Sequence, residues 1–251
     1  MAGSVEQVPV AEWRVGLTGD PFDLDELVAD FAGPGVAVTQ VGGQYWLSST
    51  EFEHLPTADQ VRARAAELVQ DLNGAASFGI GGFHAVGVGH VSRVRADGGR
   101  DAFLYVEGML TLRGNVIPPL VNGQARQSPR VVALHAIASK NAAIRDALRF
   151  WQSRHENMAV NLYKVWEVIG HDLVGRARLK AWNAAIESRG WATPAETDGF
   201  RAVHDPTLLG DQARHGVRNT PSPASPMTLD DAAAFVRRVM DEWLRSKGWS
   251  G

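Results

Sequence analysis

The stretch ENMAVNLYKVWEVIGHD, residues 156–172, decides the fold of the second half of the chain. Its apolar residues recur at three- and four-residue steps, which predicts an α-helix. They are Met158, Leu162, Val165, Trp166 and Ile169. Val160 and Val168 make the other side of this helix apolar as well. A helix that is apolar nearly all round belongs inside a fold, with other helices packed about it.

The same helix carries polar residues that are costly to bury unless they are paired. They are Asn157, Asn161, Lys164, Glu167 and His171. Asn157, Lys164 and His171 are seven residues apart, so they lie along one narrow strip. We expect this strip either to meet a partner, as buried support or as a binding site, or to face water.

The composition is that of a globular protein, with 45% hydrophobic and 21% charged residues. It contains no apolar run of about 18 residues, so no membrane span is predicted. The start of the sequence has no continuous apolar core, so no signal peptide is predicted either. The absence of cysteine excludes disulfides, thiolate zinc sites and a cysteine nucleophile, and it favours a cytoplasmic protein.

Charge is spread unevenly along the chain, although the net charge is only −3. Residues 1–115 hold 15 acidic and 7 basic residues, whereas residues 116–251 hold 13 acidic and 18 basic residues. This asymmetry indicates an anionic partner for the second half.

The first half predicts the element order β-α-β-β-α-β-β. Strands are expected at 11–18, 36–41, 44–49, 83–96 and 100–113, and helices from Pro21 and from 58 to about Leu72. The boundary signals are an N-cap at Asp20, a hairpin at Gly42-Gly43, a capping box at Thr57–Gln60 and a helix end at Asn73-Gly74. We predict an α+β domain over 1–115 with an antiparallel-rich sheet. Its first six elements match the ferredoxin-like order, with one strand added.

A linker is predicted at 116–128, where Pro118-Pro119 and Asn122-Gly123 interrupt any periodicity. An all-α helical bundle should follow over 129–251. Residues 130–169 allow one long helix, by their unbroken apolar spacing, or two helices, by the capping box Ser153–Glu156. We favour the break near 153–156, because helices average about 11–12 residues. Further helices are expected over 174–188, from the capping box at Thr193 and from the one at Thr228.

The sequence predicts no metal, no cofactor and no serine hydrolase site. His155-Glu156 lacks the second histidine of the HExxH zinc motif, since Ala159 stands in its place. No GxSxG nucleophile motif is present. The glycine-rich stretch at 79–90 matches no phosphate-binding loop, and its small residues favour close backbone packing.

Nucleic acid is the best candidate for an anionic partner. The segment from Arg126 to His155 holds six Lys/Arg residues against one acid, Asp146. They are Arg126, Arg130, Lys140, Arg145, Arg149 and Arg154. Arg214 and Arg218 add to them in the segment 210–227, which contains three prolines. Clustered arginines neutralise phosphates, and the alternative interpretation is a solvated helix face.

The helical half resembles the HEPN superfamily. The resemblance rests on Ala213-Arg214-His215-Gly216 before the last predicted helix and on the all-helical pattern, and it covers about residues 129–247. Many members of that superfamily are dimeric, metal-independent ribonucleases or RNA-binding accessory modules. This sequence departs from the usual signature, because Arg214 and His215 are adjacent rather than separated by several residues.

The resemblance implies roles for individual residues. As a ribonuclease, the chain would use His215 as general acid or base and Arg214 to stabilise charge on the scissile phosphate. The candidate binding residues are Asn157, Asn161, Lys164, His171, Arg149 and Arg218. The alternative is that Arg214 and His215 only tether their loop to the central helix.

The leading hypothesis is a non-catalytic cytoplasmic binding or regulatory protein, with the bundle as a HEPN-like interaction module. The alternative is a metal-independent ribonuclease of HEPN type that uses Arg214 and His215. A third hypothesis is a small-ligand sensor, with the small-residue strand of the first domain lining a pocket. The expected partners are RNA, another protein or a second copy of the chain in a homodimer, and not a membrane.

Overall fold

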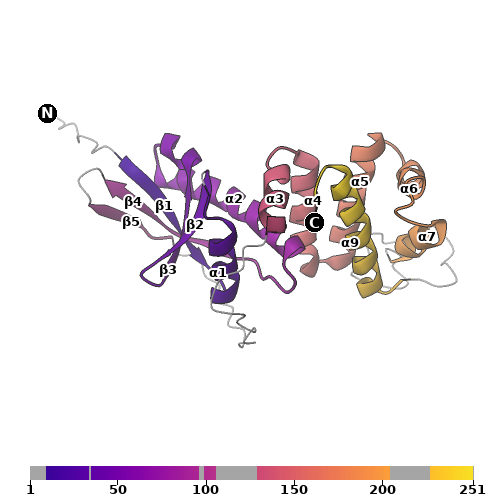
Figure 1. Ribbon diagram of the computed structural model, residues 1–251, viewed down its shortest axis with the longest axis horizontal. Helices are drawn as coiled ribbons and strands as arrows, with labels where there is room; N and C mark the ends of the chain where they lie inside the picture. Colours follow the sequence, from indigo (N-terminus) through magenta and orange to yellow (C-terminus); the bar gives the residue numbers. More distant parts are fainter. Residues whose placement is uncertain (1–9, 34, 96–98, 106–128, 204–226, 251) are drawn as a thin grey trace. The chain divides into compact units, whose positions relative to one another are not determined.

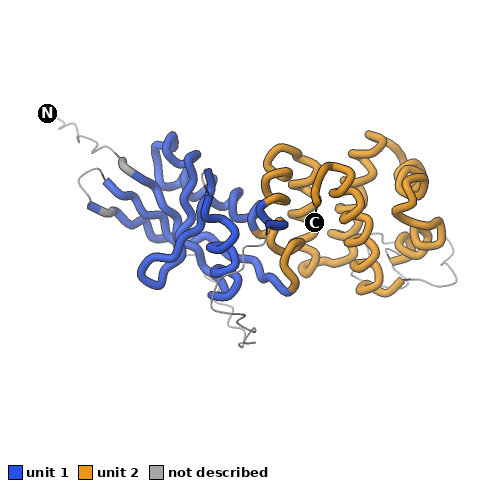
Figure 2. The backbone as a smooth tube through the Cα atoms, viewed as in Figure 1, with its two compact units in different colours: residues 1–72, 82–132 blue, residues 73–81, 133–251 orange. Residues whose placement is uncertain are grey.

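The computed structural model describes residues 10–33, 35–95, 99–105, 129–203 and 227–250 (Figure 1). An antiparallel sheet with helices comes first, and a helical region follows it, so the predicted fold class is confirmed. The chain divides into two compact units (Figure 2). The sheet unit comprises residues 1–72 and 82–132, and the helical unit comprises residues 73–81 and 133–251.

The sheet has five strands in the order β2-β3-β1-β4-β5, and every neighbouring pair is antiparallel. The strands are β1 (Val10–Thr18), β2 (Val36–Val41), β3 (Gln44–Ser49), β4 (Gly87–Arg95) and β5 (Arg100–Phe103). Helices α1 (Pro21–Asp30) and α2 (Ala58–Gly79) and the short 3-10 helix η1 (Thr50–His54) lie between them in the chain. The predicted element order is confirmed, and β5 is the added strand, beside β4.

Local signals set the beginnings of these elements. The Asp20 carboxylate accepts a hydrogen bond from the Phe22 amide at the start of α1. Gly42 and Gly43 both have positive φ, 61° and 78°, which the two-residue turn between β2 and β3 requires. The predicted N-cap and the predicted hairpin are therefore both confirmed.

One face of the sheet forms the core of this unit. On β1, Trp13, Val15 and Leu17 are buried, whereas Glu12 and Arg14, on either side of Trp13, are only half-buried. This alternation follows from the two-residue period of a strand. The buried face therefore carries the apolar residues, and the other face carries the polar ones.

The prediction that α2 ends near Leu72 is wrong, because the helix continues to Gly79. The pair Asn73-Gly74 predicts a helix end, but Gly74 lies in the interior of the helix and is buried. A Cβ atom at Gly74 would lie 3.1 Å from the Leu148 Cβ, so glycine here permits close packing against another helix. The last residues of α2, from Asn73 on, belong to the helical unit.

Six α-helices are described in the second half of the chain. They are α3 (Pro129–Ala138), α4 (Ala142–Gln152), α5 (Met158–Val174), α6 (Leu179–Glu187), α7 (Pro194–Ala202) and α9 (Leu229–Ser246), with a 3-10 turn η2 (Ser153–His155) before α5. The favoured break near 153–156 is confirmed. A second break, with Asn141 as the N-cap of α4, was not predicted. The capping boxes at Thr193 and Thr228 are both present.

Helix α5 is the buried centre of the helical unit, as its apolar pattern predicts. It packs against α4, α6 and α9. Its Trp166 is 1% exposed and contacts the rings of Phe200 and Phe235, with centroids 5.1 and 5.4 Å away. Gly170 lets Trp182 of α6 lie against the helix backbone, since a Cβ at Gly170 would be 2.4 Å from the Trp182 Cγ. In the described ranges, no helix is both long and apolar enough to cross a membrane.

Candidate functional site

The predicted catalytic pair falls in a part of the chain that the structure does not describe. Arg214, His215 and Arg218 lie within 204–226, outside the described residues. Their roles in catalysis and binding therefore stay predictions. The predicted linker at 116–128 also lies outside the described residues, so the domain boundary proposed there stays a prediction too.

Two of the polar residues of ENMAVNLYKVWEVIGHD stabilise the start of α5. Asn157 is the N-cap, and its Oδ1 accepts a hydrogen bond from the Val160 amide at 3.2 Å. Asn161 is 6% exposed, and its Nδ2 donates to the Ser153 carbonyl oxygen at 2.7 Å. Asn157 rather than Ser153 therefore caps this helix, and the buried amide of Asn161 joins it to η2.

The other two strip residues lie nearer the surface. Lys164 is half-buried, and its Nζ lies 5.1 Å from the centre of the Phe150 ring on α4. This contact is a cation–π interaction. His171 is exposed in the last turn of α5. Only Asn161 among the predicted binding residues of α5 is therefore buried, while Asn157 and His171 face water.

Basic side chains dominate the segment from α3 to the first turn of α6. Residues 129–180 hold nine Lys/Arg and four Asp/Glu. One of these acids is already engaged, since Asp172 Oδ2 lies 2.7 Å from Lys247 Nζ and accepts from Trp243 Nε1 at 2.9 Å. Within the described residues, no ion pair involves Lys140, Arg145, Arg176, Arg178 or Lys180. Arg149, a predicted binding residue, is half-buried on α4 in the same region.

Most arginines of α7 and α9, in contrast, form ion pairs with acidic residues. Arg201 lies 3.3 Å from Asp198, and Arg245 lies 2.7 Å from Glu242. Arg238 reaches from α9 to Glu196 on α7. These three cations are neutralised within the fold, so most of the available positive charge lies on α3–α6. Sequence reasoning found the part of this segment that lies within 126–155, from its composition, but it did not single out Arg176, Arg178 or Lys180.

Arg237 of α9 is a basic residue that sequence reasoning missed. It lies 159 residues along the chain from Phe78, whose carbonyl oxygen accepts a hydrogen bond from Arg237 Nη2 at 2.8 Å. No spacing rule links residues so far apart. Its neighbour Arg154, on η2, was included in the predicted basic segment.

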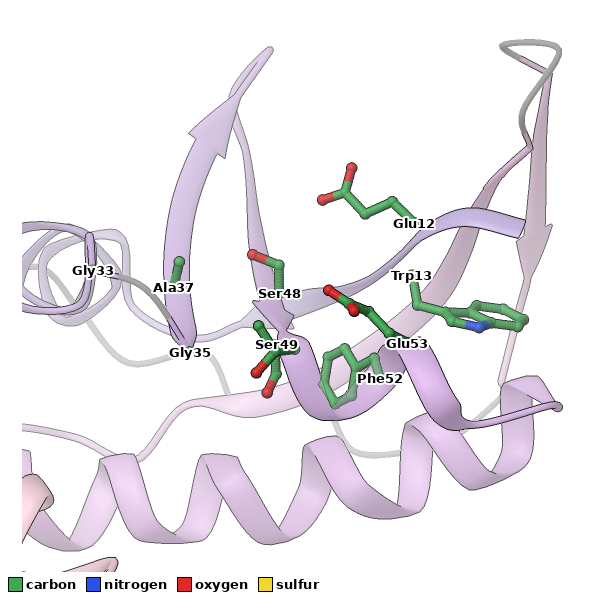
Figure 3. Close-up of a pocket in the computed structure, with 10 residues that line it drawn as sticks. Glu12, Trp13, Gly33, Gly35, Ala37, Ser48, Ser49, Phe52 and Glu53 are labelled. Carbon is green, nitrogen blue, oxygen red and sulfur yellow. The ribbon is translucent and has the colours of Figure 1, made fainter. Parts of the chain in front are cut away.

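The sheet unit contains a shallow pocket of about 230 Å³ (Figure 3). Two carboxylates and several hydroxyl groups line it, together with two buried aromatic residues. The lining residues are Glu12, Trp13, Gly33, Gly35, Ala37, Ser48, Ser49, Thr50, Phe52 and Glu53. The small-residue strand proposed for a ligand pocket, at 85–89, does not line it. The volume is below the roughly 300–1,000 Å³ typical of small-molecule sites.

The sheet unit also buries one carboxylate, Asp23 on α1. Asp23 is 1% exposed, and its Oδ2 lies 3.1 Å from Nδ1 of the exposed His84. Its Oδ1 has no hydrogen-bond partner among the described residues. Burial raises the pKa of Asp23, and hydrogen bonds from the His84 backbone and side chain partly oppose that shift. No group of three His, Asp or Glu side chains in the described part of the chain is arranged to hold a metal ion.

Comparison with known proteins gives no relative. No family model, no curated protein and no solved structure matches the chain.

Proposed function

We propose that the chain is a non-catalytic binding protein whose helical unit takes an anionic partner, with RNA as the favoured one. The observation that carries this proposal is the charge distribution on α3–α6. Nine basic residues stand there against five acids, and five of the basic side chains have no ion pair among the described residues. The basic residues of α7 and α9, by contrast, are mostly paired.

The physical argument concerns counterions. An arginine in an internal ion pair has its charge compensated before any ligand arrives. An unpaired surface arginine holds only mobile anions, and a nucleic acid releases its own counterions when it replaces them. A surface of unpaired Lys and Arg therefore binds polyphosphates with a strong dependence on salt.

RNA is favoured over other polyanions by the resemblance of the helical half to HEPN proteins. The alternative, a metal-independent ribonuclease, uses Arg214 and His215 and rests on the Ala213–Gly216 motif alone. A protein partner and a second copy of the chain are the remaining candidates for the basic surface.

The test is the binding of a labelled single-stranded RNA, followed by fluorescence anisotropy in EDTA. We expect affinity to fall steeply between about 50 and 200 mM salt, with a log–log slope of roughly 0.7 per phosphate neutralised. Arg145→Ala together with Arg178→Ala should weaken binding and reduce that slope. Arg201→Ala and Arg245→Ala are matched controls, because both arginines are already paired with acids.

Two results would contradict the proposal. Absence of RNA binding at low salt would remove RNA as the partner. Equal effects of the unpaired and the paired arginines would remove the basic surface of α3–α6 as its site. RNA cleavage in EDTA that disappears in His215→Ala, with folding intact by circular dichroism, would replace the binding protein by the ribonuclease.

A further inference from the structure

We infer that Arg154 and Arg237 form a phosphate-binding site in the helical unit, at the ends of α2 and α4. The inference rests on the proposed function, because it names the chemical group of the anionic partner that is held there. It concerns a cluster of two arginines and two aromatic residues, Phe78 and Trp151.

Arg154 lies over the Trp151 ring, with its Cζ 4.4 Å from the ring centre. Its Nη1 donates a hydrogen bond to the Trp151 carbonyl oxygen at 2.8 Å. Burial lowers the pKa of Arg154, and the positive charge of Arg237 lowers it further. The guanidinium is therefore held in place beside a second cation.

Arg237 approaches the same rings from α9. Its Cζ lies 4.6 Å from the centre of the Phe78 ring and 5.8 Å from that of Trp151. Its hydrogen bond goes to the carbonyl oxygen of Phe78. The two aromatic rings contact each other edge to face, with centroids 5.7 Å apart, so all four side chains form one cluster.

Two features allow these cations to lie together. Phe78 and Trp151 stand in the last turns of α2 and α4, where backbone carbonyls carry partial negative charge. The faces of the aromatic rings are also electron-rich and attract guanidinium groups. Neither feature supplies a full negative charge. Among the described residues, no carboxylate pairs with Arg154 or Arg237.

The cluster consequently has hydrogen-bond donors in excess. An arginine has five N–H donors, and one described hydrogen bond is made by each guanidinium here. Trp151 Nε1 is buried and has no acceptor among the described residues. Helix capping explains why each arginine lies near a carbonyl oxygen. It does not explain why two like charges converge on one ring, and an anion between them would offset their repulsion.

The chemistry of the cluster selects phosphate over a nucleobase. Planar guanidinium groups match the geometry of phosphate oxygens and bind them through paired hydrogen bonds. Phe78 and Trp151 are only 1% and 3% exposed, so their rings are not available for stacking with a base. The site therefore contributes affinity that does not depend on nucleotide sequence.

The experiment uses the full chain and inorganic pyrophosphate as the probe, with binding measured by calorimetry at low salt. Arg154→Gln and Arg237→Gln remove the charges and keep an N–H donor for each carbonyl oxygen. We expect each to weaken pyrophosphate binding about tenfold, and the double variant to abolish it. Arg201→Gln and Arg245→Gln are the controls in the same unit and should bind like the wild type.

Lysine variants separate charge from geometry. Arg154→Lys and Arg237→Lys retain the cation and lose the planar fork, so they should bind with intermediate affinity. Circular dichroism and thermal unfolding establish that each variant is folded. If a glutamine variant does not fold, the lysine variant at that position replaces it. A lysine variant that binds pyrophosphate with wild-type affinity would then overturn the site.

The results separate this inference from the proposed function. Wild-type pyrophosphate binding in the double glutamine variant, or no binding in the wild type, overturns the phosphate site. If the wild type nevertheless binds the same labelled RNA with a steep salt dependence, the proposed function stands without the phosphate site. If pyrophosphate binding is lost in the double variant and the wild type binds no RNA, the site stands and RNA is not its ligand. If the double variant loses pyrophosphate binding and the wild type binds RNA, the log–log salt slope of RNA binding should fall by roughly 0.7 for each arginine removed.

Discussion

The two units of this protein differ in how some of their arginines are compensated. In the sheet unit, Arg14 pairs with Glu12, Arg64 with Glu51 and Arg93 with Asp101. In the helical unit, Arg154 and Arg237 pair with aromatic rings and backbone carbonyl oxygens. A carboxylate neutralises the positive charge of the arginine that it pairs with. An aromatic ring and a carbonyl oxygen fix an arginine in position but leave its positive charge uncompensated.

The two units also differ in their acidic residues. The sheet unit has a surplus of carboxylates and buries one of them, Asp23, with one oxygen unpartnered among the described residues. The uncompensated charge is therefore negative in one unit and positive in the other. An anionic partner is attracted by the helical unit and repelled by the sheet unit.

The largest expected effect comes from removing the ring that both arginines of the helical unit share. Trp151→Ala should reduce the free energy of unfolding by about 3–5 kcal/mol, because it leaves a cavity in a buried site. It also removes the ring face over which Arg154 lies. Urea denaturation followed by circular dichroism measures the change.

Trp151→Phe is the control for that experiment. Phenylalanine keeps an aromatic face for the guanidinium and removes the unpartnered Nε1–H, so the loss should be clearly smaller. Equal losses in the two variants would show that the arginines do not depend on the aromatic face, and the contrast between the units would lose its physical basis.

A smaller effect is expected at the buried acid of the sheet unit. Because the pKa of Asp23 is raised in the folded state, folding takes up a proton between the unfolded pKa, 3.8, and the folded value. Stability from this group is greatest below that window and falls as the pH rises through it. Asp23→Asn should therefore stabilise the protein at pH 7, because the amide stays neutral where the buried carboxyl group has lost its proton.

Thermal unfolding of wild type and Asp23→Asn from pH 4 to pH 7 tests that sign. The advantage of the variant should shrink as the pH falls and the wild-type carboxyl group becomes neutral. An advantage that stays constant with pH would mean that Asp23 is not buried as a charge. Asn retains an oxygen that can accept from His84, so the contact itself is preserved.

The features that the sequence predicts well depend on residues within a few positions of each other. The caps at Asp20, Thr193 and Thr228 and the turn at Gly42-Gly43 are each complete within four residues. The end of α2 was predicted wrongly for the opposite reason. The role of Gly74 is set by Leu148, which lies on another helix and far along the chain.

The two arginines of the candidate site differ in the same respect, because one is predictable from the local sequence and the other is not. Arg154 belongs to a basic segment that composition alone identifies. Arg237 becomes its neighbour only when α9 has folded against the ends of α2 and α4, and no local pattern marks it. The polar residues of α5 were conspicuous in the sequence because they interrupt an apolar helix. Two of them are explained by the local start of that helix, at Asn157 and Asn161.

The smallest effect is expected at a paired arginine of the sheet unit. Arg64 donates to Glu51 and also to Glu67, and it lowers the pKa of Glu51. Its side chain is 33% exposed, so water and salt screen the pair and Arg64→Ala should cost only about 0.2–1 kcal/mol. A double-mutant cycle with Glu51→Ala, measured by urea denaturation at low and at high salt, isolates the coupling. Because that charge is already compensated, Arg64→Ala should leave RNA affinity unchanged, although it removes the same charge as Arg237→Gln. Equal losses of RNA affinity in these two variants would mean that net charge alone governs binding, and that the partner of an arginine does not decide whether its charge is available.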